Sequence, residues 1–101
     1  MKPGSIAYVV WTKKGTPARG LRLVRVESLL GKAARVTFLH SGRTTMRAVR
    51  LLHPIEGYVV VGRDGWWHHW RQLEDALHVA RQLGDRLLAV VEAETGEVIE
   101  G

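Results

Sequence analysis

Short apolar runs, interrupted at close intervals by glycine or proline, are the feature that most limits what this chain can fold into. In the first half the runs are Ile6 to Trp11, Leu21 to Leu30, Ala33 to His40 and Thr44 to Val49. The breaks at Gly31-Lys32 and Ser41-Gly42-Arg43 are each short enough for the turn of a β-hairpin. Runs of this length bounded by turn residues are typical of β-strands, so we expect the first half to be built from strands.

Alternation along these runs predicts which side chains face inward. Ala34, Val36, Phe38 and His40 share one side of their strand, and Arg35 lies on the other, as in a half-buried antiparallel strand. In the following strand Met46 and Ala48 are expected to point inward and Arg47 outward. In LRLVRVES the apolar positions change parity after Leu23, which indicates a bulge or a bend of the kind that closes a small barrel.

The stretch RLVRVESLLGKAARVTFLHSGRTTMRAVRLLHP, one long bent strand followed by two hairpins, resembles Tudor-type and other SH3-like small barrels. The likeness covers residues 19 to 55 and implies a barrel face that binds nucleic acid or protein. Tudor domains that recognise methylated side chains often have aromatic residues near the glycine turn. This chain has His40 and Ser41 there, so recognition of methyl-lysine is not expected.

The second half has the order ββαββ. A hairpin is expected in EGYVVVGRDGWWHHW, a helix in RQLEDALHVARQLG, and two strands in RLLAVVEA and EVIE. The helix has an apolar stripe that should cover one face of the sheet, formed by Leu73, Ala76, Leu77, Ala80 and Leu83. Gly84 is placed to end it. The pattern is similar to small uncharacterised bacterial ββαββ domains, a likeness to which we attach no function.

These patterns predict an α+β, mainly β fold. An SH3-like small barrel at residues 1–55 is followed by an acidic ββαββ unit with one helix at residues 56–101, packed on the barrel. The boundary falls near Pro54, where a proline follows an apolar segment and the sign of the charge changes. A chain of 101 residues is long enough for one ordinary domain or two very small ones that share a core.

Charge divides the chain into two unlike halves. Residues 1–55 contain eleven lysines and arginines against one acid, Glu27, for a net charge of +10. Residues 56–101 contain four arginines against nine acids, for a net charge of −5. A basic half of this kind is typical of nucleic-acid-binding proteins. The alternative is that the acidic half docks on the basic half, within one chain or between two.

Seven basic side chains are candidates for contacts to phosphate: Lys13, Lys14, Arg19, Arg22, Arg35, Arg43 and Arg47. If the second, third and fourth strands pair in order, Arg22, Arg35 and Arg47 line up across one face of the barrel. The others lie in the long first loop and at a turn. Such a group predicts a surface that binds the nucleic-acid backbone. The alternative is an arginine-rich exterior, of the kind that a thermophilic source or a GC-rich genome produces.

The string WWHHW is the second candidate site. On a strand it places Trp66, His68 and Trp70 on one face, with Trp67 and His69 on the other. Exposed tryptophans here could stack on bases or anchor a protein partner, so Trp66, Trp67 and Trp70 are the candidates. The alternative is that the tryptophans pack the sheet against the helix and the barrel.

No pattern in the chain indicates catalysis or a bound cofactor. There is no cysteine, no glycine-rich phosphate loop and no serine in a nucleophile-elbow setting. His68 and His69 are neighbours on a strand and face opposite ways, so no metal site is expected. His40 and His53 are interpreted as structural. No apolar run approaches the ~20 residues of a membrane span, and we expect a soluble cytoplasmic protein.

The sequence therefore predicts a non-catalytic nucleic-acid-binding or accessory protein, with DNA or RNA as its partner and no membrane contact. A first alternative is a protein-interaction module, such as a phage or host regulatory factor that docks through its tryptophan-rich surface. A second is self-association, in which acidic and basic halves of different chains meet.

Overall fold

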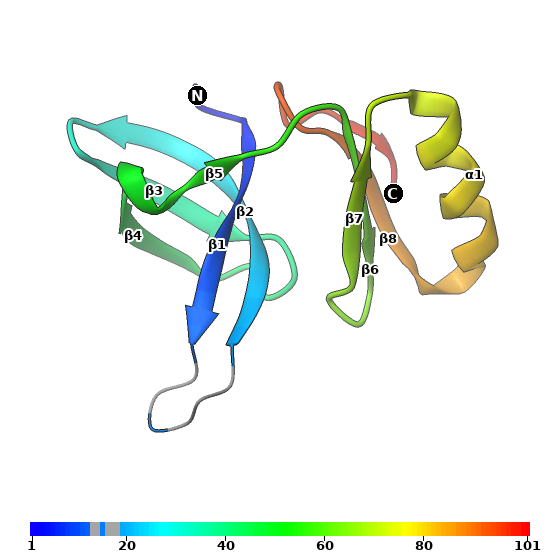
Figure 1. Ribbon diagram of the computed structural model, residues 1–101, viewed down its shortest axis with the longest axis horizontal. Coiled ribbons are helices and arrows are strands. Elements are labelled where there is room, and N and C mark those ends of the chain that lie inside the picture. The colour runs from blue at the N-terminus through cyan, green and yellow to red at the C-terminus, as the bar shows by residue number, and fades with distance from the viewer. Residues whose placement is uncertain (13–14, 16–18) are drawn as a thin grey trace.

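The computed structural model describes residues 1–12, 15 and 19–101. They form an α+β, mainly β fold of two antiparallel sheets and one α-helix (Figure 1). The strand order is β4-β3-β2-β1-β5 in the first sheet and β7-β6-β8-β9 in the second. The predicted fold class is confirmed at this level of description.

The bounds of the elements follow the predicted runs closely. The first sheet contains β1 (Ile6–Thr12), β2 (Arg19–Leu30), β3 (Ala33–Phe38), β4 (Thr44–Ala48) and β5 (His53–Pro54), with a 3-10 turn at Val49–Leu51 before β5. The second part contains β6 (Tyr58–Gly62), β7 (Trp67–Trp70), α1 (Leu73–Leu83), a 3-10 turn at Gly84–Arg86, β8 (Leu87–Glu92) and β9 (Val98–Glu100). The predicted ββαββ order is confirmed.

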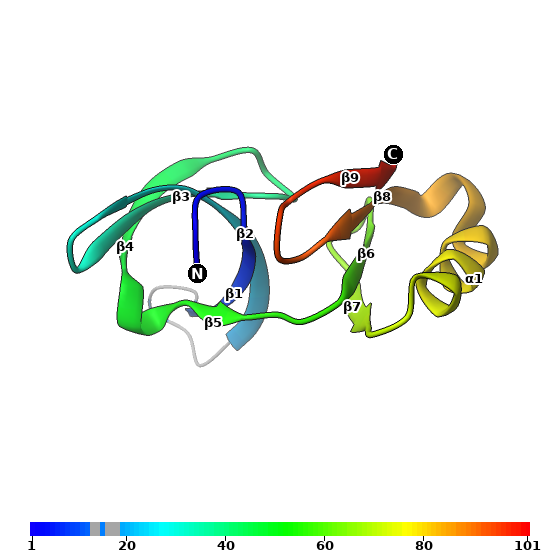
Figure 2. The ribbon, with the colours of Figure 1, turned by 90° about the horizontal axis from the view of Figure 1, so that it is seen from above.

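The first sheet curls around its own apolar side chains (Figure 2). The register of β2 against β3 shifts between Val26 and Ser28, so β2 contains a bulge as predicted, but the bulge lies beyond the change of parity that suggested it. Leu23 and Val24 are both buried because they pack on opposite faces of the sheet. Side chains inside the curl include the fully buried Val24, Val26 and Val36. Among the described residues no ladder joins β4 to β5, so the sheet is open and the expected barrel is not closed.

The predicted orientation of β4 is wrong. Arg47 stands opposite Ala34 and Met46 opposite Arg35. Directly opposite residues share a face, so Arg47 lies on the inner side with the buried Ala34. Met46 is 45% exposed on the outer side. A shift of one residue exchanges the faces of a strand, and here the long apolar stem of arginine lines the inner face in place of methionine. The outward orientation of Arg35 is confirmed, because Arg35 is exposed.

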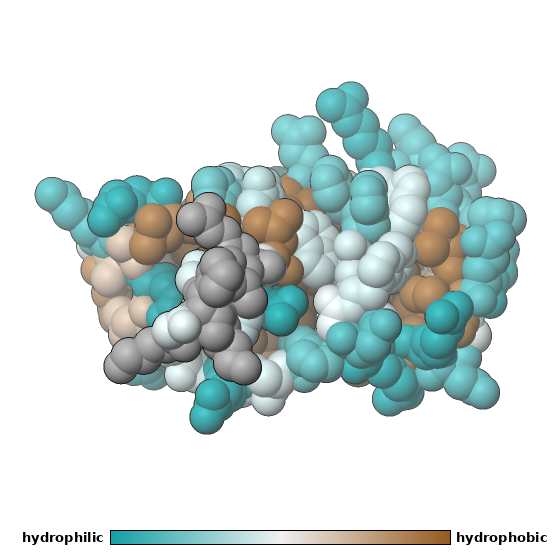
Figure 3. Space-filling model, turned by 60° about the horizontal axis from the view of Figure 1, so that its bottom comes forward, coloured by the Kyte–Doolittle hydropathy of each residue, from teal (hydrophilic) through white to brown (hydrophobic). Residues whose placement is uncertain are grey.

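Three layers stack along the molecule. The curled sheet packs on one face of the second sheet, and α1 covers the opposite face (Figures 1 and 2). Ile6 and Leu23 of the first sheet form one cluster with Val59, Val61 and Val91 of the second, so the two sheets share a core. From below, apolar side chains reach the surface between hydrophilic ones (Figure 3).

The predicted helix stripe is confirmed in part, since Ala76, Ala80 and Leu83 pack against the sheet. Leu73 and Leu77 are half-buried and lie outside this cluster, and Val79 packs in it in addition. Ala76 and Ala80 are 0% and 2% exposed and lie against Val60 and Val90. Small side chains at these positions bring the helix close to the sheet. Within the described part of the chain, no helix has the length and apolar character needed to cross a membrane.

Val60 tests the packing of helix on sheet. It is fully buried beneath α1, so Val60→Ala should lower the free energy of unfolding by about 2 kcal/mol, through lost burial and the cavity left behind. Val98 is 53% exposed, and Val98→Ala should change this free energy by less than about 0.5 kcal/mol. Urea denaturation of both variants measures the difference, and equal losses would contradict the proposed packing.

Candidate functional site

A pocket of about 490 Å³ lies where the turn between β3 and β4 meets the hairpin of β6 and β7. We call it the basic pocket. Its lining residues are Trp11, Arg22, Leu23, Phe38, Leu39, His40, Ser41, Arg43, Thr44, Thr45, Arg47, Val61, Gly65 and Trp67. Leu23, Leu39 and Val61 also belong to the core cluster between the sheets, so this part of the lining is apolar and fixed.

The pairing of β1 with β2 brings Trp11 and Arg22 together. Arg22 stands opposite Val9, and Trp11 stands opposite Gly20. The two side chains are therefore diagonal neighbours on the inner face, and the Arg22 guanidinium carbon lies 5.1 Å from the centroid of the Trp11 ring. A Cβ added at Gly20 would lie 3.2 Å from Arg22 Nη1. The absence of a side chain at Gly20 therefore makes room for this guanidinium.

Arg47 enters the pocket from β4. Its guanidinium carbon lies 5.7 Å from the centroid of the Phe38 ring. Its Nη1 donates to the hydroxyl oxygen of Thr45 at 3.3 Å and to the carbonyl oxygen of Met46 at 3.0 Å. These contacts hold the half-buried Arg47 side chain in one orientation while part of its fork of N–H donors can still meet a ligand.

Arg43 reaches the pocket from the turn between β3 and β4. The turn is closed by hydrogen bonds from Phe38 N to Arg43 O at 2.8 Å and from Gly42 N to Phe38 O at 2.8 Å. Gly42 has φ of 74°, a conformation that glycine adopts without strain. The Arg43 side chain is exposed, unlike the half-buried Arg22 and Arg47.

The acidic half of the chain also contributes to the basic pocket. Trp67 of β7 forms part of the wall, and its Nε1 donates to the carbonyl oxygen of Leu21 at 3.0 Å. Its ring also packs on Tyr8, with ring centroids 5.7 Å apart. The nearby carboxylate of Asp64 accepts a hydrogen bond from Trp66 N at 3.0 Å inside the hairpin turn. Both halves of the chain are therefore needed to form the pocket.

The charge of the lining is positive. It includes three arginines and, among the residues that the structure describes, no aspartate or glutamate. Guanidinium groups remain protonated and offer N–H donors in a planar fork that matches phosphate and carboxylate oxygens. The pocket therefore favours an anionic ligand, and a cation such as a methylated lysine would meet three like charges.

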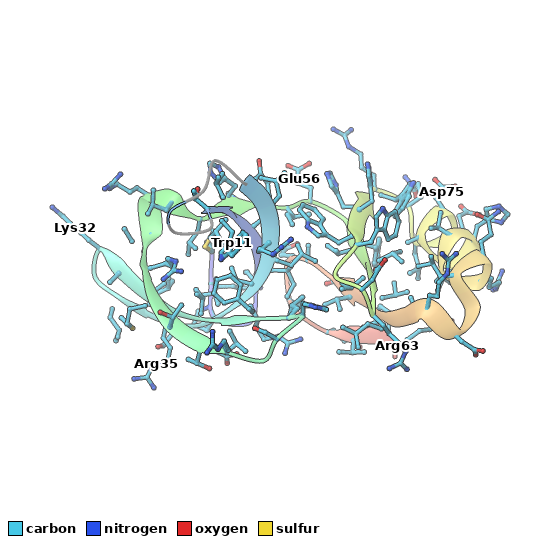
Figure 4. The ribbon with its side chains drawn as sticks, turned by 90° about the horizontal axis from the view of Figure 1, so that it is seen from below. Trp11, Lys32, Arg35, Glu56, Arg63 and Asp75 are labelled. Carbon is cyan, nitrogen blue, oxygen red and sulfur yellow. The ribbon has the colours of Figure 1, made fainter. Side chains whose placement is uncertain are left out.

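The structure brings together three of the seven predicted phosphate contacts, namely Arg22, Arg43 and Arg47. The predicted alignment of Arg22, Arg35 and Arg47 on one face is wrong for Arg35, which shares the outer face with Met46. Figure 4 shows Arg35 pointing away from the curl that contains Trp11. Lys13 and Lys14 lie outside the described residues, as does the side chain of Arg19.

The three candidate tryptophans do not share a surface. The pairing of β6 with β7 confirms the predicted alternation, since Trp70 stands opposite Tyr58 and Trp67 opposite Val61. Trp70 packs in the cluster beneath α1, and Trp67 lies on the other face of the sheet, in the pocket wall. Trp66 precedes β7 and is 43% exposed. Only Trp67 of the three joins the arginines.

The sequence interpretation missed Trp11 and Phe38 as site residues, and it assigned His40 a structural role. His40 is exposed and lines the pocket beside Gly65. No alternation in the sequence marks Trp11, because residues 6–11 are all apolar. Its place on the inner face follows only from the register of β1 with β2.

Within the described ranges, no three histidine, aspartate or glutamate side chains gather in a way that could hold a metal ion. His53 stacks on Tyr8, with ring centroids 4.8 Å apart, outside the basic pocket. Comparison of the chain with known protein families, with curated proteins and with solved structures finds no match.

Proposed function

We propose that this protein is a non-catalytic nucleic-acid-binding protein that holds the phosphate backbone in the basic pocket. The observation that supports this most strongly is the convergence of Arg22, Arg43 and Arg47 on one cavity whose described lining contains no carboxylate. The net charge of +10 on residues 1–55 adds a long-range attraction for a polyanion.

The arrangement of the arginines suits phosphate contacts. Arg22 lies over Trp11 and Arg47 over Phe38, so two of the three guanidinium groups are positioned before a ligand arrives. A positioned side chain loses less conformational entropy on binding than a free one. Each phosphate that a guanidinium neutralises releases condensed counterions, so binding weakens as salt is added.

The form of the first sheet supports the same proposal. A long bulged β2, two hairpins and the sheet order β4-β3-β2-β1-β5 agree with an open form of an SH3-like small barrel. The resemblance implies binding by a barrel face, and the basic pocket includes Trp11, Arg22 and Arg47 from the inner face of the first sheet. Because one fold serves many functions, the chemistry of the pocket supports the proposal more strongly than the fold does.

The rival proposal, a protein partner docked on a tryptophan-rich surface, has less support. Such an anchor needs aromatic side chains gathered on one exposed patch. Trp67 and Trp70 are half-buried on opposite faces of the second sheet, which leaves Trp66 as the exposed member of the set.

Titration of the protein into labelled single-stranded and duplex DNA and RNA, followed by fluorescence anisotropy at several salt concentrations, tests the proposal. Three phosphate contacts predict that the logarithm of the binding constant falls with the logarithm of salt with a slope of about −2 to −3. Absence of binding to all four nucleic acids at low salt would overturn the proposal and favour a protein partner.

Arg43 tests the phosphate contacts individually. Arg43→Ala should weaken binding similarly for all sequences and make the salt slope less steep by about 1, because one phosphate contact is lost. Arg50→Ala removes an equal charge from an exposed residue that does not line the pocket, and it should leave the slope unchanged. Equal slopes for the two variants would contradict a contact between Arg43 and phosphate.

A further inference from the structure

We propose that the basic pocket takes an unpaired base of a single strand, an inference that rests on the proposed function and names its ligand. The base would enter the cavity with its plane against Arg22 and Trp11, and its flanking phosphates would meet Arg43, Arg47 and the N–H groups at the edge of the Arg22 guanidinium. Single-stranded nucleic acid, rather than duplex, is then the partner.

The shape of the site favours a strand that can present single bases. A volume of about 490 Å³ lies within the ~300–1,000 Å³ typical of pockets that enclose a small ligand. In a duplex the bases are paired and stacked inside, so no base can turn its flat face into a pocket unless it is unpaired first. In a single strand the bases can turn outward and stack on protein side chains.

The walls offer flat surfaces for stacking. Trp11, Phe38 and Trp67 all line the cavity. The Arg22 guanidinium carbon lies over the Trp11 ring, 5.1 Å from its centroid, so a cation and an aromatic ring stand together in the wall. Bases stack on aromatic rings and on guanidinium planes alike, and every base has such a face. Stacking of this kind predicts weak preference among the bases.

Polar groups in the lining can meet the edge of a base. The hydroxyl oxygen of Thr45 accepts from Arg47 Nη1 at 3.3 Å, which leaves the O–H of Thr45 as a donor. The hydroxyl oxygen of Ser41 accepts from Arg43 N at 3.3 Å and retains its O–H in the same way. Because hydroxyl groups rotate, these donors adapt to different acceptor atoms on the base edge.

The first experiment compares nucleic acids on the unmodified protein. At equal length, sequence and salt, the single strand should bind at least about tenfold more tightly than the duplex, since only the single strand gains a stacked base. A strand whose bases are replaced by abasic sites should lose about the same factor. If duplex and abasic strand bind as tightly as the intact strand, with the salt slope retained, the base pocket is overturned and the proposed function stands. If a mononucleotide binds as tightly as the strand, the proposal that the ligand is a single strand is overturned.

The second experiment assigns the stacking to Trp11. Trp11→Leu should weaken binding of the single strand by about tenfold and leave the salt slope unchanged, because it removes a stacking surface and no charge. Trp11→Phe keeps a ring and should restore most of the affinity. Trp66→Leu removes an indole outside the pocket. This variant should bind the single strand with the affinity of the unmodified protein. Unchanged binding by Trp11→Leu, or an equal loss in Trp66→Leu, would overturn the placement of the base.

Discussion

Reversing the charge of Arg47 is expected to weaken the binding of single-stranded nucleic acid by about 30- to 100-fold, or about 2 to 3 kcal/mol. The guanidinium of Arg47 is held in the pocket by Phe38, Thr45 and the carbonyl of Met46. A glutamate there removes a phosphate contact and places a negative charge inside a cavity whose described lining contains no other carboxylate. Repulsion of the backbone then adds to the lost contact.

Arg35→Glu is the matched control, because it changes the net charge equally from the opposite face of the sheet. At physiological salt the Debye length is about 8 Å, so a reversal outside the pocket should cost less than about threefold in affinity. Anisotropy titrations of both variants measure the difference, and thermal melts confirm that each is folded. Equal losses would show that general charge attraction, and no defined pocket, binds the nucleic acid.

Arg47→Lys separates charge from geometry. Lysine keeps the positive charge but lacks the planar fork, which lies over Phe38 and can hold a phosphate with two parallel hydrogen bonds. We expect an affinity about fivefold below that of the unmodified protein, between the unmodified protein and Arg47→Glu. The salt slope should be retained, because the charge is unchanged.

Local sequence signals predicted most of the fold. The glycine breaks and the main part of the helix stripe, Ala76 to Leu83, depend on a few neighbouring residues each, and both appear in the structure. A bulge in β2 also appears, but it lies between Val26 and Ser28 and not at the change of parity after Leu23. The amphipathic period of the helix was sufficient to identify Ala76 and Ala80 as buried. The alternation of β7 separated the two sets of side chains but did not say which set is buried, and in the structure Trp67 and Trp70 are both half-buried on opposite faces.

The candidate site could be predicted only in part, because it depends on the register between strands. Arg35 and Arg47 are both arginines in short β-strands, and alternation alone does not say which face of β4 is the inner one. A shift of one residue in the register exchanges the two faces. Trp11 and Trp67 lie far apart in the sequence and line one cavity because the two sheets pack together. Charge counting identified the basic half, but it did not distinguish the pocket arginines from the one on the outer face.

Since the pocket is formed by both sheets, the junction between them should matter for stability, and Gly57 lies at this junction. Gly57 has φ of 86°, which side chains rarely tolerate, and an added Cβ would collide with the carbonyl oxygen of Trp70. The carbonyl oxygen of Gly57 also accepts a hydrogen bond from Ala93 N at 2.9 Å, which restricts how far the backbone can move. The strand end at Trp70 must therefore shift if a methyl group is added.

Gly57→Ala should lower the free energy of unfolding by about 3 kcal/mol and the melting temperature by about 15 °C, because the strained φ and the collision add together. Gly31→Ala is the matched control, since Gly31 has φ of 68° but no atom within 4 Å of an added Cβ. That variant should lose only about 1 kcal/mol, the cost of the backbone conformation alone. Thermal denaturation of both proteins measures the two effects. Equal losses of stability in the two variants would mean that the backbone around Gly57 moves easily to accept the methyl group. The two sheets would then not be held rigidly together, which would contradict a pocket of fixed shape between them.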